Sequence, residues 1–74
     1  MAQFFTRGLI YMIKFTKREQ EICNLVIKGL TNKQIAQNLF ISVHTVKATL
    51  EHIYEKVGFS NRLLLALYLT KENK

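Results

Sequence analysis

The side chains best suited to chemistry lie between residues 42 and 51. Ser42, His44 and Thr45 stand at the start of a predicted helix, where the first backbone N–H groups have no partner within the helix. Hydroxyl, imidazole and amide donors at the positive end of a helix dipole suit an anion, and a phosphate in particular. The sequence therefore predicts anion binding at this end of the helix.

Three further residues follow on the outward face of the same helix. Lys47, Ala48 and Glu51 share this face with His44, at successive spacings of three, one and three residues. A lysine can donate to O6 and N7 of guanine, an alanine can contact the methyl group of thymine, and a carboxylate can accept from the amino group of cytosine. The row is therefore suited to reading base edges, although the Glu51 carboxylate would also repel phosphates.

The charge of the chain favours an acidic partner. Eleven Lys and Arg stand against five Asp and Glu, which gives a formal net charge of +6. Nucleic acid is the first candidate and an anionic membrane surface the second. Lys33, Lys17 and Arg18 are candidates for contacts with backbone phosphates, against the alternative that each is a solvated surface charge. No apolar run approaches the roughly 20 residues of a membrane span, so we expect no membrane.

Catalysis is not expected of this chain. The sequence contains no Asp, and Glu51 and Glu55 form an i, i+4 pair on a helix surface. His44 and His52 are too far apart for a helical metal pair, and Cys23 has no second thiol. We therefore expect neither an enzyme nor a metal or cofactor site. The lone cysteine excludes an internal disulfide, which favours the cytoplasm, and its apolar surroundings place Cys23 in the core.

Two short helical periods between residues 31 and 57 position the outward row. The first places Ile35, Ala36 and Leu39 on one face, and the second repeats apolar residues at Val46, Leu50, Ile53 and Val57. Only Phe40, Ile41 and Ser42 separate them, and Ala36 is small where the helices must cross. This spacing predicts a helix-turn-helix, whose second helix enters the major groove of DNA. A small helical bundle with a tight corner is the alternative on spacing alone.

Capping signals divide the chain into four helices. Thr16 with Glu19, and Thr31 with Gln34, have the spacing of capping boxes, with Ser42 and Ser60 as the later caps. The predicted helices begin near residues 17, 32, 43 and 61 and end at about residues 28, 39, 57 and 70. The fold class is therefore all-α, a four-helix bundle without a sheet, spanning residues 15–72.

The last predicted helix is apolar on two sides. Leu65, Ala66 and Leu69 share one side, and the opposite side carries Leu63, Leu64 and Leu67. An apolar outer face usually marks an interface, so we expect a two-fold dimer through these leucines. The alternative is that the apolar leader at residues 1–14 covers this face. The leader shows neither a clean helical nor a clean strand period, and we expect it to pack within the protein or its dimer.

Several separate motifs agree in order and spacing with one known family. The chain carries Phe-Thr-Lys-Arg-Glu at 15–19, Thr-Asn-Lys-Gln-Ile-Ala at 31–36, Ile-Ser at 41–42, Thr-Val-Lys at 45–47, Lys-Val-Gly at 56–58, and also Gly29 and Arg62. Over residues 15–70 it resembles the LuxR/GerE-type helix-turn-helix domain of NarL/FixJ-like regulators. It departs from the family at Cys23, Thr49, Glu51 and Leu65.

The resemblance implies a function and its partners. It implies a sequence-specific, DNA-binding transcription regulator whose third helix reads the major groove of double-stranded DNA. It also implies a homodimer through the fourth helix, on a roughly palindromic site, with RNA polymerase as a further partner to consider. A protein-interaction module of the same fold that forms mixed dimers without binding DNA is the alternative. The chain fits either a stand-alone protein or the output domain of a longer regulator.

Overall fold

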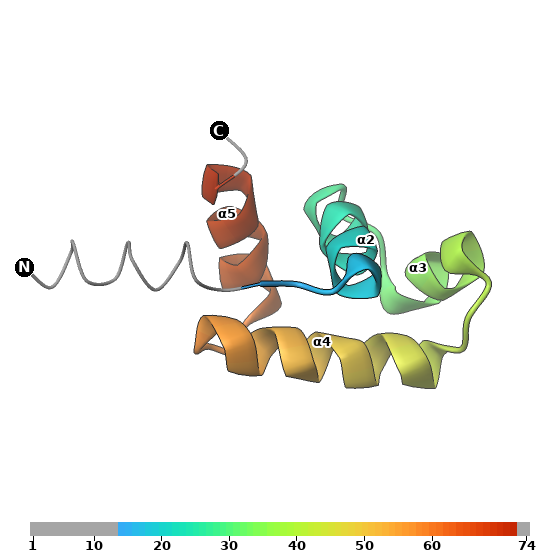
Figure 1. The fold of residues 1–74 in the computed structure, drawn as a ribbon. Coiled ribbons are helices and arrows are strands. Elements are labelled where there is room, and N and C mark those ends of the chain that lie inside the picture. Colours follow the sequence, from blue (N-terminus) through green and yellow to red (C-terminus); the bar gives the residue numbers. More distant parts are fainter. Residues whose placement is uncertain (1–13, 73–74) are drawn as a thin grey trace, which may run out of the picture.

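The computed structural model describes residues 14–72, and the helices found there are four. They are α2 (Lys17–Ile27), α3 (Asn32–Leu39), α4 (Val43–Val57) and α5 (Arg62–Glu72). Figure 1 shows α4 along one edge of the domain, with α2 and α3 on the same side of it and α5 at its C-terminal end. Within the described residues no strand is present. The predicted all-α class is therefore confirmed, whereas the leader at 1–14 and its suggested packing on the last helix lie almost wholly outside these residues.

Side-chain caps set the starts of the helices, and most of these starts were predicted from the sequence. The Glu19 amide donates to Thr16 Oγ1 (3.1 Å), and the Thr16 amide donates back to Glu19 Oε1 (2.9 Å). The Thr31 and Gln34 pair forms the same reciprocal box at the start of α3. Each box satisfies two amides that the helix itself leaves unpaired, and that is why α2 and α3 begin at the predicted residues.

Two predicted helix ends, given as approximate, differ from the structure by one or two residues. α2 ends at Ile27, with Lys28 as its C-cap, and α5 runs on past Thr70 to Glu72. The predicted cap Ser60 is wrong, because Asn61 Oδ1 accepts from the Leu64 amide (3.0 Å). Since Asn61 makes the capping bond, α5 begins one residue later than predicted.

The core lies where the four helices meet. Its buried apolar side chains are Ile22, Cys23, Val26, Ile35, Ala36, Val46, Leu50, Ile53, Leu65 and Leu69. The small Ala36 is buried between α3 and its neighbours, as the close crossing requires. Cys23 is fully buried, so its predicted place in the core is confirmed. On α5 the split is also as predicted, since Leu63, Leu64 and Leu67 stay exposed.

Long polar side chains join elements that are far apart in sequence. Arg62 at the start of α5 donates to Asn32 Oδ1 (2.5 Å) and to the Leu30 carbonyl (2.7 Å). This clamp holds the first turn of α5 against the loop that leads into α3. The direction of α5 is therefore fixed relative to the helix-turn-helix formed by α3 and α4.

Candidate nucleic-acid interface

The turn between α3 and α4 ends in a side-chain N-cap. Ser42 Oγ accepts from the Thr45 amide (3.0 Å) and lies 2.9 Å from Thr45 Oγ1. Ser42 and Thr45 were predicted as anion donors, and both are first of all parts of this cap. Within residues 14–72 the Val43 and His44 amides have no hydrogen-bond acceptor. The first turn of α4 therefore offers two free backbone donors beside exposed hydroxyl and imidazole groups.

The predicted row on α4 forms one solvent-exposed face. His44, Lys47, Ala48 and Glu51 are all exposed. The opposite face holds Val46, Leu50 and Ile53, all buried in the core. Packing against α2 and α3 thus fixes the rotation of α4 about its axis, and this rotation turns the polar row outward. The structure brings these four predicted residues together on a single helix surface.

Lys33 stands apart from that row, near the start of α3. Its side chain is exposed, and no ion pair involves it among residues 14–72. Arg18 on α2, by contrast, pairs with Glu21 at 3.2 Å. Lys33 is therefore free to meet a phosphate, whereas Arg18 would have to exchange an existing partner.

Two basic residues are engaged inside the protein, and neither set of contacts was predicted from the sequence. Lys56 Nζ donates to Glu19 Oε1 (2.6 Å) and to the Lys14 carbonyl (2.9 Å). Arg62 is engaged with Asn32 and Leu30, as described above. No local sequence signal points to either partnership, because the partners lie 30 or more residues away. Both charges are therefore unavailable to an external anion.

The buried carboxylate of Glu19 remains ionised at neutral pH. Burial raises its pKa, but the hydrogen bonds from Lys56 and from the Thr16 backbone, with the charges of Lys56 and His52, bring the pKa below its ordinary value. Burial, together with the negative charge of Glu19, raises the pKa of Cys23 to about 11. The Cys23 thiol is therefore neutral and chemically quiet.

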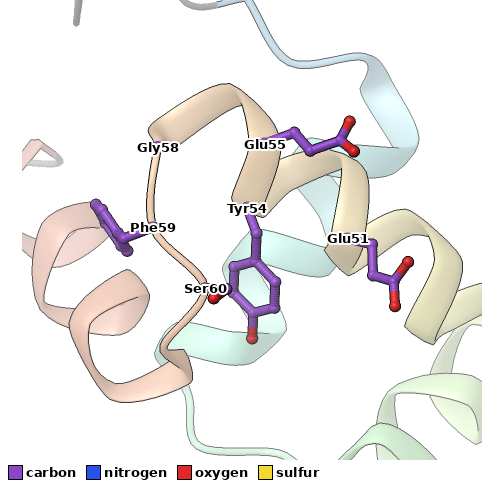
Figure 2. A pocket seen from close by; sticks show the side chains of 6 residues that line it. All are labelled: Glu51, Tyr54, Glu55, Gly58, Phe59 and Ser60. Carbon is purple, nitrogen blue, oxygen red and sulfur yellow. The ribbon is translucent and has the colours of Figure 1, made fainter.

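An open hollow lies at the C-terminal end of α4, with a volume of about 540 Å³. Its lining residues are Glu51, Tyr54, Glu55, Gly58, Phe59 and Ser60. In the view of Figure 2, the Tyr54 ring lies between the Glu51 side chain and the Phe59 ring. The hollow is lined by two carboxylates and no basic group, so it repels phosphates. Anion binding is thus favoured at the N-terminal half of α4 and disfavoured beyond it.

The described residues hold no candidate for a metal site or a membrane span. No group of three or more His, Cys, Asp or Glu side chains could hold a metal ion there. None of the helices in residues 14–72 is both long and apolar enough to cross a membrane.

These elements define the class of protein: a helix-turn-helix domain. It presents a polar face on α4 and an apolar face on α5. The family of bacterial regulatory proteins known as the luxR family matches residues 14–69, and the chain belongs to this family. The family predicted from the motifs is therefore confirmed. Membership supports a DNA-binding regulator.

Individual relatives agree with this assignment. The chain is 44% identical to the probable transcriptional regulator ycf29 of Cyanophora paradoxa over 61 residues. This matched segment is 82% of this chain and 29% of the relative. The protein of the same name from Porphyra purpurea is 42% identical over 65 residues, 88% of this chain and 31% of that one. The oxygen regulatory protein NreC of Staphylococcus aureus is 46% identical over 57 residues, which are 77% of this chain and 26% of NreC. The chain thus matches less than a third of each of these relatives.

Proposed function

We propose that this chain is a sequence-specific DNA-binding unit of a transcription regulator, with α4 in the major groove. The observation that carries the proposal is the polar row on α4, continuous with the free Val43 and His44 amides. In this arrangement the amides meet a phosphate, and the side chains that follow them meet base edges. The names of the ycf29 relatives, probable transcriptional regulators, support the same role.

Each residue of the interface has its own part in this proposal. Lys47 donates to a guanine edge, and Ala48 beside it contacts a thymine methyl group. Lys33 on α3 neutralises a backbone phosphate, which adds affinity without adding specificity. Ser42 and Thr45 hold the first turn of α4 in shape, and their hydroxyl groups stay exposed for a phosphate oxygen.

The proposed working form is a two-fold dimer through α5. Leu63, Leu64 and Leu67 are 69%, 49% and 58% exposed, and they form the outer face of that helix. A self-complementary contact on this face would place two α4 helices about one DNA turn apart. The matching DNA site is roughly palindromic. RNA polymerase is a proposed further partner of the assembled dimer, and the cytoplasm its proposed location.

Selection of binding sites from random duplex DNA tests the proposal. The parent should enrich a roughly palindromic sequence, and Lys47→Ala should lose about 10-fold to 100-fold in affinity for it while relaxing one base position. Lys33→Ala, the matched control on α3, should weaken binding to every sequence alike. Failure of the parent to enrich any sequence would refute sequence-specific binding. An equal loss for Lys47→Ala on every duplex would instead make Lys47 a phosphate contact.

One observation favours a second candidate function. Glu51 and Glu55 give the C-terminal half of α4 an acidic hollow, which suits a protein better than DNA. A module that forms mixed dimers through α5 and does not bind DNA would have such a surface. A gel-shift titration against random genomic fragments separates the two functions, because this module would leave the fragments unshifted.

A further inference from the structure

Phe40, in the turn between α3 and α4, is the residue whose surroundings the fold explains least. Its side chain is 93% exposed, more than any other large apolar side chain among residues 14–72. A phenylalanine in water contributes nothing to the core, and burying it would remove a large apolar area from solvent. The folded monomer therefore gains nothing from this ring.

The backbone at Phe40 makes a phenylalanine still less expected. Phe40 has φ 58° and ψ 44°, and it is the one non-glycine residue with positive φ in the described part of the chain. The ends of α2 and α4 reach the same region with Gly29 (φ 84°) and Gly58 (φ 90°). This left-handed region is open to glycine and strained for a residue with a side chain. A strained residue whose ring has no use in the monomer points to a function outside it.

The turn fixes the backbone from which the ring projects. The Ile41 amide donates to the Ala36 carbonyl (3.0 Å), and the Phe40 amide donates to the same oxygen. The first is the 6→1 bond found in Schellman motifs and the second is the 5→1 bond of an αL cap, and together they fix the backbone on both sides of Phe40. Ser42 then caps α4 two residues later. The direction of the Cα–Cβ bond of Phe40 is therefore set before any partner arrives.

The position of the turn identifies the surface that the ring would meet. When the second helix of a helix-turn-helix enters the major groove, the first helix crosses the sugar-phosphate backbone. The turn between them passes over the strand at the edge of the groove. Phe40 is followed there by Val43, which is 37% exposed, and by the free amides of Val43 and His44. Amides suit phosphate oxygens, and an aromatic ring beside them suits the apolar face of a deoxyribose.

We propose that Phe40 binds DNA by packing its ring against the deoxyribose face of the strand that the α3–α4 turn crosses. The inference rests on the proposed function, because it requires α4 in the major groove. The contact is with sugar, so it adds affinity on every sequence and leaves the choice of bases to α4.

Three substitutions at Phe40 test this contact without threatening the fold. Phe40→Gly and Phe40→Asn remove the ring and suit positive φ, so their melting temperatures should equal or exceed that of the parent. Both should bind a single half-site about fivefold more weakly, and a palindrome or random duplex that holds the dimer, where two such contacts are lost, about 25-fold more weakly. Phe40→Tyr keeps the ring and should bind as the parent does. A photo-reactive benzoylphenylalanine at position 40 should cross-link to the DNA strand.

The possible results separate this inference from the function on which it rests. If the parent binds duplex DNA and Phe40→Gly binds it equally well, the contact is refuted while the proposed function stands. A loss on the palindrome without a loss on the half-site would refute it too, since it would place Phe40 between two protomers. Cross-linking to a second protein chain would have the same meaning. If the parent binds no duplex at all, the function and the contact both fail.

Discussion

Replacement of Lys56 by methionine should destabilise the domain through the loss of one ammonium group. Lys56 Nζ donates to Glu19 Oε1 (2.6 Å) and to the Lys14 carbonyl (2.9 Å), and it lies 5.8 Å from the centre of the Phe15 ring. The last turn of α4 is thereby tied to the segment that leads into α2. Methionine keeps most of the apolar stem but provides no donor, so the charge and its hydrogen bonds are lost with little change in packing.

The size of the effect follows from the burial of the two partners. The Glu19 side chain is 7% exposed, and the Lys56 side chain is 34% exposed. Removal of one member of a fully buried pair costs about 3–5 kcal/mol, whereas a single hydrogen bond to a charged group contributes about 1.5–3 kcal/mol. Because Lys56 keeps a third of its contact with water, the lower range applies. For a domain of this size, a loss of about 2 kcal/mol lowers the melting temperature by roughly 10 °C.

The pH dependence of stability gives an independent check on this reasoning. In the parent the pKa of Glu19 lies below its ordinary value of 4.5. This difference stabilises the folded state above that value, and the stabilisation is lost as the pH falls through the folded pKa. In Lys56→Met the burial of Glu19 is opposed only by the Thr16 amide and the charge of His52, so its pKa should rise. The stability gap between parent and variant should therefore narrow in acid.

Urea denaturation followed by far-UV circular dichroism, at neutral and acid pH, measures both effects. Lys47→Met is the matched control, because Lys47 is an exposed lysine on the same helix with no ion-pair partner among residues 14–72. The control should change the free energy of unfolding by no more than about 0.5 kcal/mol. If Lys56→Met unfolds like this control, or if its deficit is the same at both pH values, the argument from the buried pair is refuted.

Three further predictions concern the core and the two proposed surfaces. The buried Cys23 thiol should react with a thiol reagent only when the domain opens, and labelling of the native protein as fast as of the unfolded chain would contradict this. Because burial raises its pKa from the ordinary value of 9.0 to about 11, the stability of the domain should fall as the pH rises past 9.0. Leu67→Glu, at a site 58% exposed, should leave the fold intact and weaken binding to a palindrome but not to a half-site; an unchanged palindrome affinity would rule out the α5 dimer. Glu51→Gln should tighten binding to all duplexes alike, because it removes a charge that repels phosphates; a loss of discrimination at one base pair would show instead that Glu51 reads cytosine.

Local signals in the sequence predicted most of the fold. The bounds of α3 and α4 follow from Thr31, Ser42 and Gly58, since caps and stops act within one turn of the residue that makes them. The rotation of α4 follows from its apolar period, which is equally local. The choice between Ser60 and Asn61 could not be made in this way, because both residue types cap helices and only the path of the backbone selects one.

The features that were not predicted depend on contacts between distant residues. The Lys56–Glu19 pair and the Arg62 clamp join residues 37 and 30–32 positions apart, and no period or capping rule relates such positions. The left-handed conformation of Phe40 was missed for a different reason. Glycine is the residue expected at a left-handed helix end, so a phenylalanine at position 40 gave no sign of this conformation.

The number of free basic groups near the groove makes the salt dependence of DNA binding predictable. α3 and α4 carry Lys33, Lys47 and Lys56, but the last is engaged with Glu19 and Lys14. Two free cations per protomer make four in a dimer. Each cation that displaces one counterion from the DNA, whether it meets a phosphate or lies in the groove between phosphates, changes the slope of log K against log salt by about −0.9. The backbone amides of α4 carry no net charge and displace no counterion.

The slope for the proposed dimer should therefore lie near −3.6, at roughly 0.9 for each of the four cations. Fluorescence anisotropy titrations of one palindrome at several salt concentrations measure it. Lys33→Ala should make the slope shallower by about two, because each protomer loses one phosphate contact. Lys28→Ala is the control, since Lys28 is the C-cap of α2 and belongs to neither helix of the helix-turn-helix. A parent slope much steeper than −4 would mean that cations beyond α3 and α4, such as Lys17 or Arg18, also reach the DNA. A slope unaffected by Lys33→Ala would remove Lys33 from the interface.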